Sequence, residues 1–109
     1  MNGYQVTFFT QQDRRHGHQP INEWLMELAK SLGIAGSTST LGVEGMGRSA
    51  KRHSAKFFEF ADQPIEITMI VNEPQVAQLF DRLEAEAAEL FYVKSAVEYG
   101  SVGTGIRKP

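Results

Sequence analysis

Glycines and basic side chains gather in one stretch of the chain, GIAGSTSTLGVEGMGRSAKRHSAK (residues 33–56), and together they suit the binding of an anion. Gly42, Gly45 and Gly47 let the backbone approach a ligand closely, and N–H groups exposed in such a loop can form an anion-binding concavity. Arg48 would add a planar, permanently charged donor. No Gly-Lys-Ser/Thr sequence ends the loop, which excludes a P-loop nucleotide hydrolase. From the residues alone, a hairpin whose glycines only serve turns explains the same pattern.

The basic run at the end of this stretch has two interpretations, a solvated loop or a surface for phosphate or an acidic protein. The whole chain carries a formal net charge of −2, whereas a nucleic-acid-binding domain normally has a broad basic footprint. The aromatic signature of RNA-recognition domains is also absent from the strand-like segment IEITMIV (residues 65–71). We therefore expect no binding of nucleic acid.

Metal binding and catalysis have little support in the pattern of residues. His16, His18 and His53 could ligate a metal ion, but the chain has no cysteine, and the acidic residues form no tight cluster with them. No combination of a nucleophile, an orienting base and oxyanion donors is recognisable. We expect a protein without enzymatic activity.

The elements that position these residues are predicted from apolar periodicity. Residues 4–10, 34–43, 65–71 and 90–99 have the composition or the alternation of strands. Apolar residues recur with helical spacing between Ile21 and Leu32 and again between Val76 and Ala87. Pro20 occupies the expected first position of the first helix, and Gly33 suits a left-handed cap at its end. Asn72 and Gln75 form a capping pair before the second helix. In the third strand one face is expected to carry Ile65, Ile67, Met69 and Val71. In the last strand one face is expected to carry Phe91, Val93, Val97 and Tyr99.

This order of strand, helix, strand, strand, helix and strand predicts an α+β, ferredoxin-like sandwich. Both helices should cover one face of an antiparallel sheet. The opposite face would have no cover within one chain, so a sheet-lined oligomer would bury it. We expect a single domain over residues 1–99, with a loop at about 42–56 and a Gly-rich tail over 100–109. No apolar run approaches the roughly 20 residues of a membrane helix, and no signal peptide is recognisable, so we expect a cytoplasmic protein without membrane insertion.

Two motifs resemble those of the PII signal-transduction family. In that family a strand begins Gly-Ile-x-Gly-x-Thr-x-Thr and runs into Lys-Gly-Phe-Gly-Arg, which opens a long mobile loop. Here residues 33–40 read GIAGSTST and residues 44–48 read EGMGR, with Glu for Lys, Met for Phe and one extra residue near Gly42. The likeness covers nearly the whole chain and is greatest to the uncharacterised PII-like branch with a shortened loop.

The resemblance implies a homotrimer that binds an adenine nucleotide (AMP, ADP, ATP or a cyclic dinucleotide) in clefts between subunits and needs no cofactor. Its loop would change shape and dock on a target such as a membrane transporter or a cytoplasmic enzyme. Bicarbonate is a further candidate ligand, because some PII-like relatives are associated with bicarbonate handling. Carried over residue by residue, the ligand-binding positions are Gly36, Thr38, Gly45, Met46, Gly47, Arg48, Met69, Ile70, Val71, Arg107 and Lys108. The partner-docking loop would present Lys51, Arg52, His53 and Lys56.

One departure from the PII pattern limits the choice of ligand. PII proteins have a second Gly-rich loop between the second helix and the last strand, which cradles phosphates, whereas this chain reads EAEAAEL (residues 84–90). Glu84, Glu86 and Glu89 would repel phosphate, which favours ADP or AMP over ATP. The tyrosine that is modified in the long loop of PII proteins has no counterpart between Gly47 and Lys56. Two alternatives stay open: a metal-responsive trimer resembling the CutA proteins, with His16, His18 and His53 as ligands, and an interaction module that binds no small ligand.

Overall fold

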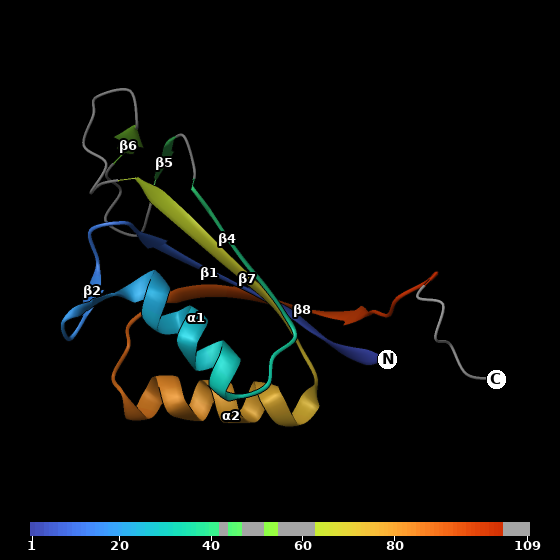
Figure 1. Cartoon of the computed structure of the whole chain (residues 1–109). Coiled ribbons are helices and arrows are strands. Elements are labelled where there is room, and N and C mark those ends of the chain that lie inside the picture. Colours follow the sequence, from blue (N-terminus) through green and yellow to red (C-terminus); the bar gives the residue numbers. More distant parts are fainter. Residues whose placement is uncertain (42–43, 47–51, 55–62, 104–109) are drawn as a thin grey trace.

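The computed structural model describes residues 1–41, 44–46, 52–54 and 63–103, and within 44–46 and 52–54 it describes the backbone only. Two helices and a set of long strands form the body of the molecule, and two short hairpins project from it (Figure 1). In chain order the elements are β1 (Asn2–Gln11), β2 (Arg15–His16), β3 (Gln19–Pro20), α1 (Ile21–Ser31), β4 (Gly36–Leu41), β5 (Glu44–Met46), β6 (Arg52–Ser54), β7 (Pro64–Val71), α2 (Glu73–Ala85) and β8 (Phe91–Glu98).

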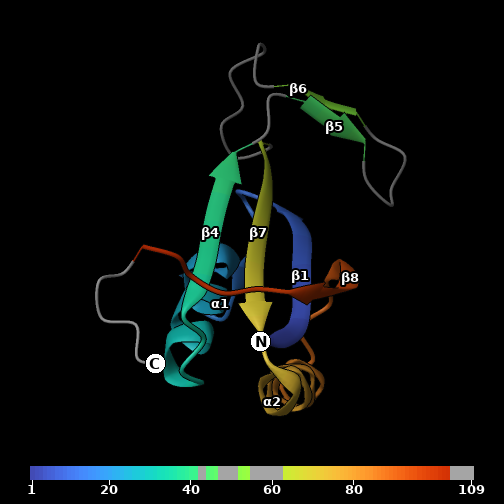
Figure 2. The ribbon, with the colours of Figure 1, turned by 90° about the vertical axis from the view of Figure 1, so that its right-hand side faces the viewer.

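The long strands form one antiparallel sheet in the order β4-β7-β1-β8, as Figure 2 shows. β1 and β7 are central, and β4 and β8 are the edges. Each helix connects two strands that do not pair with each other, as in a split βαβ arrangement. The predicted ferredoxin-like α+β fold is confirmed.

A single hydrophobic core lies between the sheet and both helices. The predicted alternation of β7 is confirmed, because Ile65, Ile67, Met69 and Val71 are at most 2% exposed. In register with them on β1 are Val6 and Phe8, which are completely buried. Leu25 and Leu28 from α1 pack into the same cluster as Leu79 and Leu83 from α2. Both helices therefore cover the same face of the sheet, as predicted.

The ends of α1 differ slightly from the prediction. Pro20 is the N-cap rather than the first helical residue, and its side chain makes no capping hydrogen bond. At the other end Gly33 has a φ of +74°, which confirms the predicted left-handed cap. The N–H of Ile34 donates to the Ala29 carbonyl at 2.9 Å, and that of Gly33 donates to the Lys30 carbonyl at 3.1 Å, which is a Schellman motif. Ile34 thus belongs to the cap, and β4 begins only at Gly36.

The start of α2 has the predicted capping box. The Gln75 N–H donates to Asn72 Oδ1 at 2.9 Å, and the Asn72 N–H donates to Gln75 Oε1 at 3.0 Å. Gln75 Nε2 also donates to the Gly33 carbonyl at 2.9 Å. One side chain therefore caps α2 and ties its beginning to the end of α1.

The end of α2 corrects the predicted apolar stripe. The helix ends at Ala85, so Ala87 is not one of its residues. Ala87 has a φ of 54°, and the N–H of Ala88 donates to the Leu83 carbonyl at 3.0 Å. This is a second Schellman motif, and here alanine takes the left-handed position that glycine usually occupies.

Phe91 and Val93 of β8 face away from the helices, whereas Tyr92 between them faces α2. Phe91 and Val93 are 50% and 51% exposed. They pair in register with Phe9 and Thr7 of β1, which lie on the sheet face opposite the core. The predicted grouping on one face is confirmed for Phe91, Val93 and Val97, whereas Tyr99 lies beyond the end of β8 at Glu98. Together with Phe9, Phe91 and Val93 make the open face of the sheet partly apolar.

Candidate functional site

The predicted ligand position Gly36 lies on the edge strand β4, on the open face of the sheet. It pairs in register with Ile70, and Thr38 pairs with Thr68. A Cβ atom added to Gly36 would meet only the Ile70 side chain, at 3.8 Å, and Gly36 has no positive φ. Among the described residues, neither packing nor backbone conformation requires a glycine at this position.

Hydroxyl groups continue across the open face from Thr38. Thr38, Thr68 and Thr7 follow one another in register across β4, β7 and β1, and the hydroxyls of Thr7 and Thr68 are 3.1 Å apart. Two residues after Thr38 on β4, the hydroxyl of Thr40 donates to the Glu66 carbonyl at 3.4 Å. Sequence reasoning singled out only Thr38, although the strand alternation alone would place Thr68 and Thr7 on the same face.

Two of the predicted base-lining residues have their side chains on the other face. Met69 and Val71 are completely buried in the core beneath the helices. Ile70 is partly exposed on the open face beside Gly36. A ligand on the open face can therefore meet the Ile70 side chain but only the backbone of its two neighbours. Side chains alternate across a strand, so three consecutive residues cannot all face one ligand.

The predicted loop starts and ends on paired strands. β4 ends at Leu41 and β7 begins at Pro64, and Leu41 pairs in register with Ile65. The Gln12 N–H donates to the Gln63 carbonyl at 2.9 Å, which ties the end of this segment to β1. In Figure 1 the β5–β6 hairpin lies beyond this end of the sheet.

This hairpin brings two predicted groups together. Gly45, a predicted ligand position, pairs with His53, and Met46 pairs with Arg52. Residues predicted to contact the ligand and residues predicted to dock on a partner thus lie on paired strands rather than at separate ends of a loop. The remaining predicted positions lie outside the described residues and stay predictions: Gly47, Arg48, Lys51, Lys56, Arg107 and Lys108.

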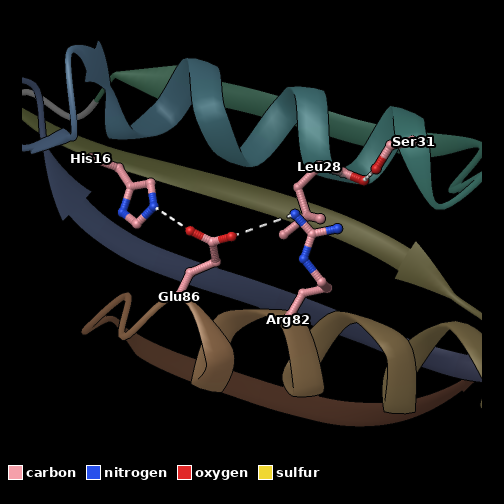
Figure 3. A network of polar contacts seen from close by, with 5 residues as sticks. All are labelled: His16, Leu28, Ser31, Arg82 and Glu86. Carbon is pink, nitrogen blue, oxygen red and sulfur yellow. Dashed lines mark hydrogen bonds and ion pairs between the residues drawn. The ribbon is translucent and has the colours of Figure 1, made fainter.

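The histidines proposed as metal ligands have different surroundings, and Figure 3 shows His16 beside Glu86. His16 Nε2 lies 3.1 Å from Glu86 Oε1, and its ring stacks on Trp24 with centroids 4.0 Å apart. Glu86 also lies 3.7 Å from the Arg82 guanidinium. His18 lies beyond Gly17 in the turn between β2 and β3. Among the described residues, which leave out the His53 side chain, no three His, Cys, Asp or Glu residues gather as a metal site would need.

The acidic junction after α2 is partly neutralised. Glu86 is engaged by His16 and Arg82, whereas the carboxylates of Glu84 and Glu89 have no hydrogen bond or ion pair within the described part of the chain. The backbone of the junction is nevertheless held, because Arg14 Nη2 donates to the Glu89 carbonyl at 2.8 Å. Of the three acids expected to repel phosphate, Glu84 and Glu89 therefore have no partner among the described residues, whereas Glu86 has two.

One tyrosine near the start of α2 has a perturbed pKa. The Tyr4 hydroxyl donates to Glu73 Oε2 at 3.3 Å. This hydrogen bond, the negative charge of Glu73 and a small loss of hydration raise the pKa of Tyr4 above its ordinary value. The Lys94 ammonium lies 4.9 Å from the centre of the same ring. Tyr4 therefore stays a neutral hydrogen-bond donor at physiological pH.

Solved structures with this fold include PII-like proteins. A protein from Thermus thermophilus described as PII-like is 20% identical, with 89% of this chain and 88% of that chain aligned at a TM-score of 0.66. CPII from Thiomonas intermedia, a nitrogen regulatory PII-like protein bound to ADP, AMP and bicarbonate, is 18% identical, with 93% and 91% aligned at 0.68. The apo form of CPII is 17% identical, with 93% and 95% aligned at 0.61. The comparison with curated proteins gives no match.

Within the described part of the chain, neither helix is long and apolar enough to cross a membrane.

Residues 3–99 match the family DUF190, described as "Uncharacterized ACR, COG1993". That match covers all the long strands and both helices, and it agrees with the PII-like fold of the solved structures. The chain belongs to the DUF190 family and has the fold of the PII-like signalling proteins.

Proposed function

We propose that the chain is a non-enzymatic, cytoplasmic PII-like regulator that binds an adenine nucleotide, with ADP or AMP preferred to ATP and bicarbonate as a further candidate ligand. The observation that carries the proposal is Gly36, an exposed glycine on edge strand β4 that neither its φ nor its packing requires. It lies beside Ile70 and leads along β4 into the Gly-rich segment. CPII, a solved structure with this fold, holds ADP, AMP and bicarbonate.

The proposed assembly is a homotrimer with the open sheet faces directed inward and the ligand in clefts between subunits. Phe9, Phe91 and Val93 are between 37% and 51% exposed on that face. Contiguous apolar surface of this kind is typical of an interface between subunits. The hydroxyl row of Thr7, Thr38 and Thr68 makes the same face polar near β4. The open face thus suits a specific contact between subunits, in which the hydroxyl groups would form hydrogen bonds with the neighbouring subunit.

The proposed mechanism is a change in the order of the loop at about 42–56. Ligand contacts with Gly45 to Arg48 would fix β5, and β6 would follow because Gly45 pairs with His53 and Met46 with Arg52. Fixing both strands would present the basic loop to a target, such as a membrane transporter or a cytoplasmic enzyme. The loop would exist in a free state and a fixed state. A ligand can shift the equilibrium between these two states only by the difference between its binding free energies to them.

Calorimetry on the full chain with AMP, ADP, ATP and a cyclic dinucleotide, each with and without bicarbonate, tests the proposal. We expect saturable binding of ADP or AMP, with ATP weaker because of Glu84 and Glu89. Replacing Arg48 with alanine should weaken binding by about 1.5–3 kcal/mol, the contribution of a charge-assisted hydrogen bond. No binding of any nucleotide at millimolar concentration would refute the claim and leave an interaction module without a small ligand. Light scattering that shows a monomer would refute the intersubunit site.

A further inference from the structure

A groove of about 340 Å³ lies between the end of α2, the acidic junction and β8. Its floor is aromatic, formed by Phe8, Phe80 and Tyr92, and Leu83 and Leu90 add apolar walls. The residues of the floor face the helices, so the groove lies on the opposite side of the sheet from Gly36 and Ile70. The proposed nucleotide function uses only the charge of Glu84 and Glu89, which line this groove and are expected to weaken the binding of ATP.

In the aromatic floor Phe8 is completely buried, Phe80 is half-buried, and Tyr92 is the exposed ring. The ring centres of Phe80 and Tyr92 are 4.8 Å apart at an angle of 59°, and Phe8 lies 6.1 Å from Phe80. Tyr92 is 45% exposed, so a ligand can reach its ring. The Lys94 ammonium lies 5.9 Å from the centre of the Phe80 ring and 4.9 Å from that of Tyr4, so Phe80 already has a cation beside it and Tyr92 is the ring left for a ligand. Ring faces at this distance attract positive charge through their quadrupole.

The charged residues that line the groove are both acidic. They are Glu84 and Glu89, whose carboxylates have no partner within the described residues. The nearby Arg14 is directed to the carbonyl oxygen of Glu89. The third acid of the junction, Glu86, is engaged by His16 and does not line the groove. An aromatic floor, together with two carboxylates that have no partner among the described residues, complements a ligand that is both apolar and positively charged.

The wall of the groove is held in place before any ligand arrives. Ala87 keeps a left-handed conformation that is strained for any residue but glycine, and it lines the groove. Arg14 and His16 hold the junction from the β2–β3 side through Glu89 and Glu86. A wall fixed in this way lowers the conformational cost of binding. Strained residues of this kind are found preferentially at ligand sites.

We propose that this groove binds a small organic cation, whose ammonium group lies against Tyr92 and is attracted by the carboxylates of Glu84 and Glu89. The volume is at the lower end of small-molecule sites, which favours a ligand of about the size of a quaternary ammonium ion with a short side chain. The same two carboxylates disfavour phosphates. A titration with an organic cation in the absence of nucleotide separates this proposal from nucleotide binding.

The experiment titrates the full chain with choline and with its neutral isostere 3,3-dimethyl-1-butanol, followed by calorimetry and NMR shifts. We expect choline to bind with a Kd in the millimolar range or tighter and the isostere at least about fivefold more weakly, the factor that corresponds to one exposed cation–π contact. Binding of choline should weaken as salt is added. Equal binding of the two compounds, or no saturation by choline up to about 100 mM, a concentration beyond any millimolar Kd, would overturn the proposal.

Variants assign the site. Tyr92→Leu and the double change E84Q/E89Q should each weaken choline binding about fivefold or more, and Tyr92→Phe should keep it because the ring remains. Phe91→Leu, on the other face of β8, is the matched control and should leave binding unchanged. Circular dichroism shows whether each variant folds. If Tyr92→Leu folds and binds choline as the unchanged chain does, or if Phe91→Leu weakens binding equally, the groove is not the site.

Discussion

Replacing Gly36 with alanine tests whether this glycine is needed for ligand binding or for the stability of the fold. In the free chain the new methyl group would meet only Ile70 at 3.8 Å, an ordinary van der Waals distance, and the backbone φ suits any residue. Alanine also reduces the conformational freedom of the unfolded chain. We therefore expect unfolding to cost about 0.4–1 kcal/mol more. If Gly36 allows close approach of the nucleotide, the same methyl group should weaken ADP binding at least about tenfold, or 1.4 kcal/mol.

The assay combines urea unfolding at a fixed protein concentration, calorimetry with ADP and light scattering. Gly3→Ala is the matched control, because a Cβ atom there would overlap the Val71 carbonyl oxygen and lie 2.9 Å from Tyr99 Cε1. It should destabilise the chain by about 1–3 kcal/mol. A Gly36→Ala variant that binds ADP with unchanged affinity refutes the assignment of Gly36 to the site. A variant that is destabilised shows instead that the fold itself requires this glycine.

Three further predictions concern α2 and its neighbours. Ala87→Gly should stabilise the chain by about 0.5–1 kcal/mol in urea unfolding, because it relieves a left-handed alanine; a loss of stability would contradict the assigned cap. Gln75→Ala should cost about 1–2 kcal/mol because it removes a capping bond and the bond to the end of α1, whereas Gln78→Ala, on the exposed side of the helix, should stay within about 0.5 kcal/mol. Glu73→Gln should lower the raised pKa of Tyr4 in an ultraviolet titration. Since that pKa is raised on folding, the stability from this contact is complete below about pH 10 and is lost as pH rises through the folded pKa, and an unchanged titration curve would rule the contact out.

The fold was predictable because local signals agree with one another. Alternation in β7 places Ile65 and Ile67 in the core, and Asn72 with Gln75 marks the start of α2. The limits of the elements were less predictable, since they depend on tertiary contacts. Ile34 has the composition of a strand residue, yet its N–H is used by the cap of α1.

The candidate site was only partly predictable. The alternation of β7 already separates Ile70 from Met69 and Val71, so their side chains could have been assigned to different faces from the sequence. The contact between His16 and Glu86 could not have been found in this way. These residues are 70 positions apart, and only the packing of the β2–β3 hairpin on the end of α2 brings them together. The aromatic groove depends on long-range packing in the same way.

In the proposed trimer, the binding site at β4 is completed by a neighbouring subunit. In a closed ring of three identical subunits each contact is heterologous, so one edge of a subunit meets a different surface of the next. β4 and β8 are the opposite edges of the sheet. The polar, glycine-bearing side of one open face would then adjoin the side of a neighbour that carries Phe91 and Val93. Gly36 could serve that contact rather than the ligand, and light scattering distinguishes the two roles. A Gly36→Ala variant that remains trimeric but loses ADP assigns the glycine to the ligand, whereas one that dissociates assigns it to the neighbouring subunit.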